Sequence, residues 1–316
     1  MIPLPVSIVR QGFLLGLAVL IALAGFGPRS VYAAPDDVLV SVQTHDGTTV
    51  DGRLSALGPD GLTVRGSGAA KAVALNRLFR LEVREPDVPP PLGGSTLRAH
   101  LIGGERVRGH FAGPAEDGLV IETADAGKVR IRFDALQSLA AIPAEAPPGY
   151  EPEARYPPTT GDDVAYRRSG DATSGLLLRV EDAGLVLEGT RGRERRVPWD
   201  DLAVLHLEND PLPPGAEALF EVETASGDRL LSAKAPRLDG EKLVLYLRSD
   251  RDTRIELPLR RVLRIGTFGG AFVFASDLPF TSTFETPYTG ADDDPTGVLL
   301  ESWYGARVDR RPAGFP

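Results

Sequence analysis

The hydrophobic pattern of the chain repeats four times between residues 38 and 265. In the first copy, Val38, Val40 and Val42 alternate with polar residues, which is the period of a half-buried β-strand. Asp46-Gly47 follows and is typical of a tight hairpin turn, because both residue types tolerate positive φ. Short apolar segments then recur up to Val83. The pattern predicts five short strands in this copy.

Glycines recur at fixed spacing inside each copy. Gly47, Gly52 and Gly61 lie five and nine residues apart, and two later copies keep both intervals. The fourth copy has Ser232 where the others have the middle glycine. A glycine inside a strand is typical of a bulge or a sharp bend. Four copies with matched spacing predict an internal repeat. The other glycines of the series are Gly104, Gly109, Gly118, Gly170, Gly175, Gly184, Gly227 and Gly240.

This strand pattern resembles the Sm-like small barrels. The resemblance implies an all-β protein with four tandem five-stranded barrels, which we name repeats 1 to 4 and place at residues 38–84, 95–143, 162–208 and 217–266. It does not extend to RNA binding, because the Asp and Asn signature of the family's RNA-contacting loop is missing at the matching places. Proline-rich joints separate the repeats and are expected to act as semi-rigid spacers. A single repeat is expected to be only marginally stable alone, so neighbouring repeats are expected to pack together.

The first 33 residues are typical of a secretory signal peptide. Arg10 precedes an uninterrupted apolar run from Phe13 to Phe26, which is too short for a bilayer, and Ala33 closes a small-residue exit. The alternative is an uncleaved N-terminal anchor. Both readings predict an exported protein in the periplasm, on the cell surface or outside the cell, without further contact with the membrane.

The composition restricts the kinds of site and partner that the protein can have. The 316 residues include no cysteine, so disulfides, thiol nucleophiles and cysteine-ligated metals are excluded. The formal charge is −9, and loss of Arg10 and Arg29 with the leader makes it −11. An exported protein that is this acidic is not expected to bind nucleic acid. The arginine-rich segment 191–196 is therefore interpreted as protection of a strand edge.

No catalytic or metal site is predicted. The sequence has no nucleophile elbow and no phosphate-binding glycine loop, and no cofactor is expected. A carboxylate pair for glycoside hydrolysis cannot be chosen among 44 acidic residues. The acidic run 292–294 is expected to be a solvated loop. The four histidines show no ligand spacing and are expected to be ordinary strand or surface residues, with His100 and His110 nearest to a pair. The other two are His45 and His206.

The pattern changes after Ile265. Residues 271–316 contain Ser276-Asp277-Leu278 after an aromatic segment, then Thr286-Pro287-Tyr288, and Trp303 shortly before Asp309-Arg310. This order resembles the opening of the NPCBM family of carbohydrate-binding modules. The resemblance implies the start of a jelly-roll β-sandwich, and the family would continue beyond Pro316, so the module is expected to be incomplete. For sugar contact the residues to choose are Tyr288, Trp303 and Tyr304, since a ring face stacks on the apolar CH face of a sugar; core packing in the missing sandwich is the other role open to these rings.

Together these features predict an exported, non-enzymatic scaffold of repeats that carries a truncated carbohydrate-binding module. A polysaccharide or cell-envelope glycan is the expected partner. One alternative is the accessory half of a secreted glycoside hydrolase, with the enzyme encoded beyond Pro316. Another is an envelope module for protein–protein assembly through exposed strands.

Overall fold

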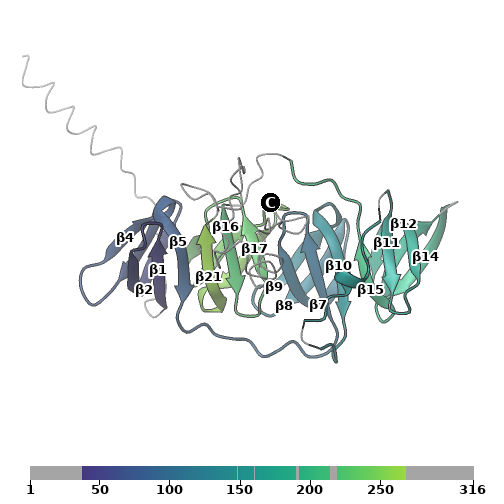
Figure 1. Cartoon of the computed structure of the whole chain (residues 1–316), viewed down its shortest axis with the longest axis horizontal. Helices are drawn as coiled ribbons and strands as arrows, with labels where there is room; N and C mark the ends of the chain where they lie inside the picture. Colours follow the sequence, from purple (N-terminus) through teal and green to yellow (C-terminus); the bar gives the residue numbers. More distant parts are fainter. Residues whose placement is uncertain (1–37, 148, 160, 190–191, 214–218, 268–316) are drawn as a thin grey trace, which may run out of the picture.

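The structure is a computed structural model that describes residues 38–147, 149–159, 161–189, 192–213 and 219–267. It confirms the all-β prediction: strands make up nearly all of its regular structure (Figure 1). Within these residues, no helix is long and apolar enough to cross a membrane. The predicted leader at 1–33 and the NPCBM-like segment at 271–316 lie outside the described residues.

Repeat 1 forms an open antiparallel sheet in the order β4-β3-β2-β1-β5. Its apolar positions alternate as the sequence predicts, because Val40, Val42, Leu54 and Leu81 are all buried in one core. The bounds of its elements are β1 Leu39–Thr44, β2 Thr49–Gly58, β3 Gly61–Arg65, β4 Lys71–Ala74, the 3-10 turn η1 Leu75–Arg77, and β5 Leu78–Val83.

Repeats 2 and 3 have the same strand order. In repeat 2 the elements are β6 Thr96–Leu101, β7 Arg106–Ala115, β8 Gly118–Thr123, β9 Gly127–Arg132, η2 Phe133–Ala135 and β10 Leu136–Ile142. In repeat 3 they are β11 Asp163–Arg167, β12 Ala172–Glu181, β13 Gly184–Gly189, β14 Arg193–Pro198 and β15 Leu202–His206. In all three repeats the fourth and fifth strands share no ladder, so each sheet is open.

In repeats 1 to 3, the middle glycine lets the long second strand bend against the third. A Cβ at Gly52 would lie 2.6 Å from the Arg65 carbonyl oxygen, and one at Gly109 would lie 2.2 Å from that of Glu122. The strand pairing shifts register two residues later in both repeats. Only a residue without a Cβ allows this approach of the two backbones, so the predicted bend has a steric cause.

Repeat 4 shows what happens without that glycine. Ser232 is fully buried, and its hydroxyl donates to the Lys234 carbonyl (2.9 Å). The second strand stops there and resumes in another sheet, so the repeat is divided into two sheets. One contains β16 Phe220–Thr224, β17 Arg229–Ser232 and β21 Val262–Thr267; the other contains β18 Arg237–Asp239, β19 Lys242–Tyr246 and β20 Arg254–Pro258, followed by η4 Leu259–Arg261.

The repeats do not stand in sequence order. Repeat 1 pairs with repeat 4 through β5 and β21, and repeat 2 pairs with repeat 3 through β10 and β15. Between the two halves the strand ladder is reduced to one residue pair, Arg229 on β17 with Arg106 on β7, and hydrogen bonds such as that from the Arg108 backbone N–H to Asp228 add to it. The row therefore runs 1-4-2-3, which Figure 1 shows as purple, green, blue and teal segments from left to right. Neighbouring repeats do pack together, but most neighbours are not consecutive.

Within each of the two ladders between fifth strands, the paired strands are related by a local pseudo-twofold axis. We name β5–β21 the 1–4 seam and β10–β15 the 2–3 seam. Leu81 faces Ile265 in one and Leu139 faces Leu205 in the other, and all four stand three residues after the start of their strands. Equivalent residues that face each other are the mark of an isologous contact. All four side chains are buried, so both seams belong to one continuous core.

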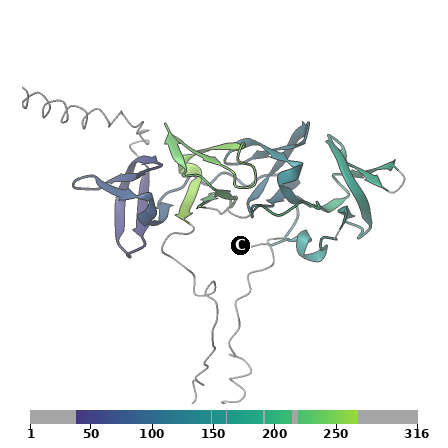
Figure 2. The same cartoon turned by 90° about the horizontal axis from the view of Figure 1, so that it is seen from above.

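The proline-rich joints follow from this order. The first joint passes repeat 4 on its way from repeat 1 to repeat 2, and the Asp87 backbone N–H donates to the Arg260 carbonyl (2.7 Å) (Figure 1). The second joint contains the short helix α2 Pro152–Arg155 and covers the 2–3 seam (Figure 2). The third joint returns from repeat 3, and Asn209 is fixed on repeat 2.

Candidate functional site

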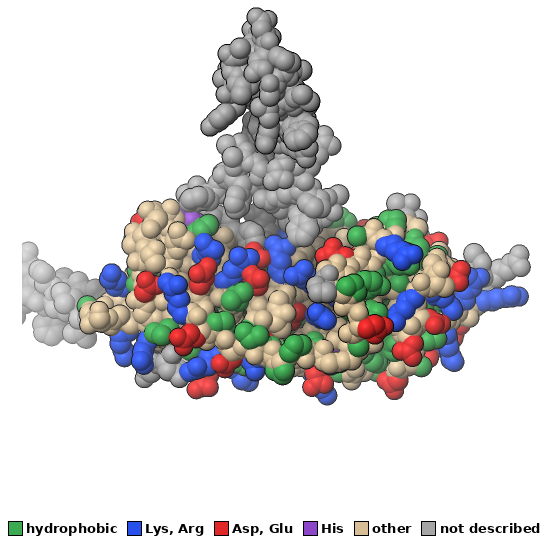
Figure 3. Space-filling view, turned by 60° about the horizontal axis from the view of Figure 1, so that its bottom comes forward, with side chains coloured by type: hydrophobic (Ala, Val, Ile, Leu, Met, Phe, Trp, Pro, Cys, Tyr) green, Lys and Arg blue, Asp and Glu red, His purple; other side chains and the backbone are tan. Residues whose placement is uncertain are grey.

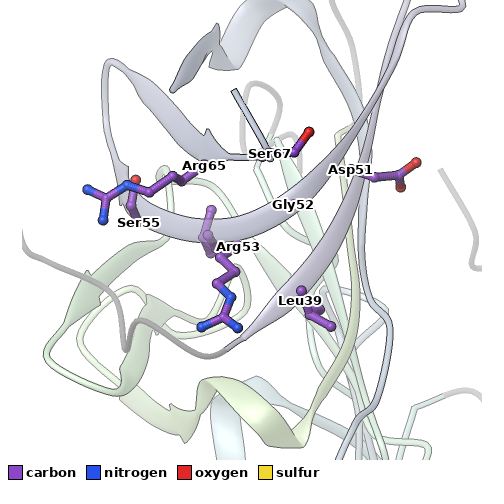
Figure 4. A pocket seen from close by; sticks show the side chains of 9 residues that line it. Leu39, Asp51, Gly52, Arg53, Ser55, Arg65 and Ser67 are labelled. Carbon is purple, nitrogen blue, oxygen red and sulfur yellow. The ribbon is translucent and has the colours of Figure 1, made fainter. Parts of the chain in front are cut away.

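A first hollow lies on repeat 1, between β2 and the loop that follows β3 (Figure 4). Its volume is about 670 Å³. The charged side chains around it, Asp51, Arg53 and Arg65, point away from one another, and Asp51 is bound to Arg84 (2.9 Å). The hollow therefore does not bring together groups that could act jointly on one ligand.

A second hollow, of about 650 Å³, lies on the outer face of the 2–3 seam beneath the second and third joints. We name it the seam cavity and define it by His100, Ser138, Glu153, His206, Asn209 and Arg248, which lie in its wall. Strands of repeats 2 and 3, the helix of one joint and a segment of another supply five of these side chains, and Arg248 comes from the segment after β19 of repeat 4. Polar groups converge here from regions far apart in sequence.

The strand ladder places three polar side chains in one row. Ser138 on β10 is paired with His100 on β6 at one side and with His206 on β15 at the other. Directly paired residues of a sheet point to the same face, with Cβ atoms about 4.5–5.5 Å apart. His100 and His206 therefore flank Ser138 on the outer face. Ser138 and His206 are buried, and His100 is half-buried.

Helix α2 places a carboxylate beside these three side chains. Arg98, two residues before His100 on β6, binds Glu153 with two nitrogens, at 3.1 Å and 2.5 Å. His100 Nε2 lies 3.4 Å from Glu153 Oε1. Both members of the Arg98–Glu153 pair are largely shielded from solvent. The bidentate geometry fixes the helix over the seam.

His206 has a defined tautomer. Its Nε2 lies 2.6 Å from the Tyr156 carbonyl oxygen, which can only accept, so Nε2 carries the proton and Nδ1 is the acceptor. Tyr156 also stacks on Tyr166, with ring centroids 5.2 Å apart. Burial lowers the pKa of His206, and burial likewise lowers the pKa of His100. Both imidazoles are therefore neutral at pH 7.

The third joint closes the cavity on its far side. Asn209 Nδ2 donates to the carbonyls of Phe133 and Leu136, both at 2.6 Å. The Glu208 backbone N–H donates to Asp163 Oδ1 (3.0 Å). These contacts fix the joint on repeat 2 and on repeat 3, so hydrogen bonds of the folded chain hold this wall of the cavity in place.

The groups in the wall of the seam cavity are suited to hydrogen bonding with a ligand. Among the residues that the structure describes, no group of three His, Cys, Asp or Glu side chains is arranged to hold a metal ion. Ser138 lies between the two imidazoles, and His206 Nε2 is already engaged with the Tyr156 carbonyl oxygen. Neutral imidazoles, a hydroxyl and amides suit a ligand that both donates and accepts hydrogen bonds.

A separate group of buried carboxylates lies where repeat 2 meets repeat 4. The Arg108 backbone N–H donates to Asp228 Oδ1 (2.8 Å), and that of Ser249 donates to Glu105 Oε1 (2.8 Å). Asp125 is nearby and accepts from the backbone N–H of Ser226 (3.1 Å). Burial raises the pKa of Asp228 to about 7 and also raises the pKa of Glu105. These groups join two repeats and line no cavity named above.

The other candidate residues are placed as follows. His45 contacts Phe79, and His110 Nδ1 lies 3.1 Å from the Ser95 carbonyl oxygen. His100 and His110 lie on the neighbouring strands β6 and β7, as expected from the sequence, but they are not directly opposite each other. His100 instead shares a strand-paired neighbour, Ser138, with His206 of repeat 3. Positive and negative side chains are mixed over the face in Figure 3.

The arginine-rich segment does lie at a sheet edge. Its strand β14 pairs with β13 alone among the described residues, and Glu194 on it binds Arg179 through two bonds of 2.9 Å. Tyr288, Trp303, Tyr304 and the acidic run 292–294 lie outside the described residues.

Sequence spacing could not reveal the seam cavity, because its two histidines stand in different repeats. One signal was nevertheless present. The segment Leu139–Ile142 is apolar at every position, whereas the equivalent segment of repeat 1 alternates. A strand without alternation is typically buried on both faces. Comparison with known protein families, curated proteins and solved structures returned no match to this chain.

Proposed function

We propose that this protein is an exported, non-enzymatic scaffold that presents the NPCBM-like segment 271–316 to a polysaccharide or cell-envelope glycan. The observation that carries the proposal is the position of β21. This strand is bonded on one side to β16 and on the other to β5 of a different repeat. A segment that follows β21 in sequence thus starts from a strand fixed in the interior of the row.

Two further features support a scaffold. The interleaved order 1-4-2-3 ties every repeat to a partner by a strand ladder or by a buried contact, and the joints are hydrogen-bonded to the repeats that they pass. The Arg98–Glu153 ion pair and the His206–Tyr156 contact fasten the second joint to repeats 2 and 3. In finer detail, each repeat is proposed to be an open variant of the Sm-like small barrel, and residues 271–316 to be the start of a jelly-roll.

A second candidate function is protein–protein assembly in the cell envelope. It is favoured by β4 and β14, which stand at opposite ends of the row and have one strand partner each among the described residues. Open strand edges can pair with another chain. Light scattering of the purified protein separates the two candidates, because a concentration-dependent ring or filament supports assembly and a monomer argues against it.

The test of the leading proposal is binding of the full chain to insoluble polysaccharides and isolated cell envelopes. Replacement of Tyr288, Trp303 and Tyr304 together by Ala is expected to abolish retention, because ring stacking on sugars is lost. Arg193→Ala, at the outer edge of repeat 3, is the matched surface control and should bind normally. Equal retention of the triple variant would contradict the proposal. N-terminal sequencing of the native protein tests export with cleavage after Ala33.

A further inference from the structure

Pairing of the strands at the 2–3 seam does not itself require the polar side chains that line the seam cavity. At the equivalent positions of the 1–4 seam, the row reads Gln43, Arg80 and Gly266, in place of His100, Ser138 and His206. Arg80 and Gly266 are half-buried there, and their strands pair just as well. The buried hydroxyl and imidazole are thus particular to one seam.

Charge in the cavity is nearly balanced. The Glu153 carboxylate is neutralised by the bidentate contact with Arg98. The two imidazoles are uncharged at pH 7 because burial lowers their pKa. Glu208 and Arg248 contribute one charge of each sign. A ligand with a net charge would find no matching excess here, and desolvation would disfavour it.

The remaining groups match a ligand that is rich in hydroxyls. The Ser138 hydroxyl and the Gln137 amide both donate and accept, and His206 Nδ1 accepts. Apolar side chains, Ile102 and Leu207 among them, complete the wall and suit the CH face of a sugar ring. The volume of about 650 Å³ falls within the range of about 300–1,000 Å³ that is typical of small-molecule sites.

We propose that the seam cavity is a binding site for a neutral mono- or disaccharide, separate from the NPCBM-like segment. The site requires repeats 2 and 3 to be paired, with the described residues of both joints and Arg248 of repeat 4 in its wall. It does not depend on the proposed function of residues 271–316, because none of its groups comes from that segment. The protein would then contact glycan at two places, one on the row of repeats and one after it.

The experiment is calorimetric titration of the full chain with glucose, N-acetylglucosamine and cellobiose. Gluconate and glucosamine serve as anionic and cationic probes of similar size. Gln137→Ala and Ser138→Ala each remove one hydrogen-bonding group and are expected to weaken binding of the preferred neutral sugar about tenfold, since one such bond is worth about 1–1.5 kcal/mol. Arg80→Ala, at the position equivalent to Ser138 in the 1–4 seam, is the matched control and should leave affinity unchanged.

Hydrogen exchange of the β10 and β15 amides distinguishes loss of sugar binding from loss of the folded seam. Sugar binding should slow exchange at the 2–3 seam in the wild type, and the variants should keep wild-type exchange without sugar. Three results would overturn the proposal: no neutral sugar binds at 10 mM (about the weakest affinity of interest), a charged probe binds more tightly, or the cavity variants bind normally. If the Tyr288, Trp303 and Tyr304 variant alone loses sugar, the cavity proposal fails and the function proposed for the segment stands.

Discussion

The 1–4 seam and the 2–3 seam share one ladder and differ in what covers it. In both, fifth strands pair about a central apolar couple, Leu81 with Ile265 and Leu139 with Leu205. On the outer face of the 1–4 seam the next positions are charged. On the outer face of the 2–3 seam they are Ala140 and Val204, which are buried. The inner faces are equivalent, and the outer faces are not.

Chain connectivity explains this difference. Repeats 2 and 3 are consecutive, so the joint between them must cross near their shared seam, and Tyr156 and Tyr166 pack on Ala140 and Val204 in a second small core. Repeats 1 and 4 are separated in sequence by the whole of repeats 2 and 3, and the described joint nearest to their seam is the first one, which leaves β5 and binds repeat 4 at Arg260 and Arg261. The seam cavity thus lies at the seam that the second joint covers.

The largest effect is expected at the centre of the seams. Leu205→Ala and Ile265→Ala each remove a fully buried side chain and should lower the free energy of unfolding by about 2–5 kcal/mol. The two losses should be similar, because the inner faces are equivalent. Denaturant unfolding measures both. A loss below about 1 kcal/mol at one site only would show that this seam is not part of the continuous core.

The contact that joins the two halves should respond to pH. The pKa of Asp228 is raised from 3.8 to about 7, chiefly by burial, so the folded protein holds a proton that the unfolded chain releases. The contribution of Asp228 to the free energy of unfolding is therefore complete below about pH 4 and is lost as the pH rises to about 7. At about 1.4 kcal/mol per pKa unit, the loss amounts to up to about 4 kcal/mol.

Asp228→Asn tests this directly. The amide oxygen can still accept from the Arg108 backbone N–H, but it carries no charge to bury beside Arg106, Arg108 and Asp125. The variant should be more stable than the wild type at pH 8 and should lose most of the pH dependence between pH 4 and 7. Glu105 keeps a smaller slope of the same sign, because burial raises its pKa too. A variant less stable at pH 8 would contradict the assignment.

A smaller effect should distinguish the outer faces. Glu153→Gln breaks the shielded bidentate pair with Arg98 and should cost about 1–3 kcal/mol, since a partly buried guanidinium loses its partner. The control is Glu223→Gln, which removes the pair with Arg264 beside the 1–4 seam, where both side chains are more exposed. That change should cost less than about 1 kcal/mol. Equal costs would remove the distinction between covered and open seams.

Much of the strand plan could be predicted from sequence, because alternation and glycine spacing are local. Gly109 predicts a bend for a steric reason that acts within one repeat. Ser232 stands at the same place in repeat 4, and the sequence does not tell that the strand divides there, since that depends on how close the third strand must come.

The order of the repeats and the candidate site could not be predicted in the same way. Leu139 and Leu205 are as apolar as any other strand residue, and nothing in one repeat specifies which other repeat it pairs with. His100 and His206 meet only through that pairing. The continuous apolar run Leu139–Ile142 did indicate burial on two faces, but not what lies above the second face.

The smallest effect is expected from mild acid, and it separates the seams without any substitution. Burial lowers the pKa of His100 and His206, so the unfolded chain takes up protons at a higher pH than the folded protein does. Their contribution to stability is complete above pH 6.5 and is lost as pH falls below it. The 1–4 seam has Gln43 and Gly266 at these positions, so no histidine there makes its stability depend on pH.

After correction for the pH dependence of the intrinsic exchange rate, amide exchange should therefore accelerate between pH 7 and 5 in β10 and β15 more than in β5 and β21. His206→Gln should reduce that difference, because a neutral side chain at this position takes up no proton. Equal acceleration in both seams would mean that the histidines are as solvated as in the unfolded chain.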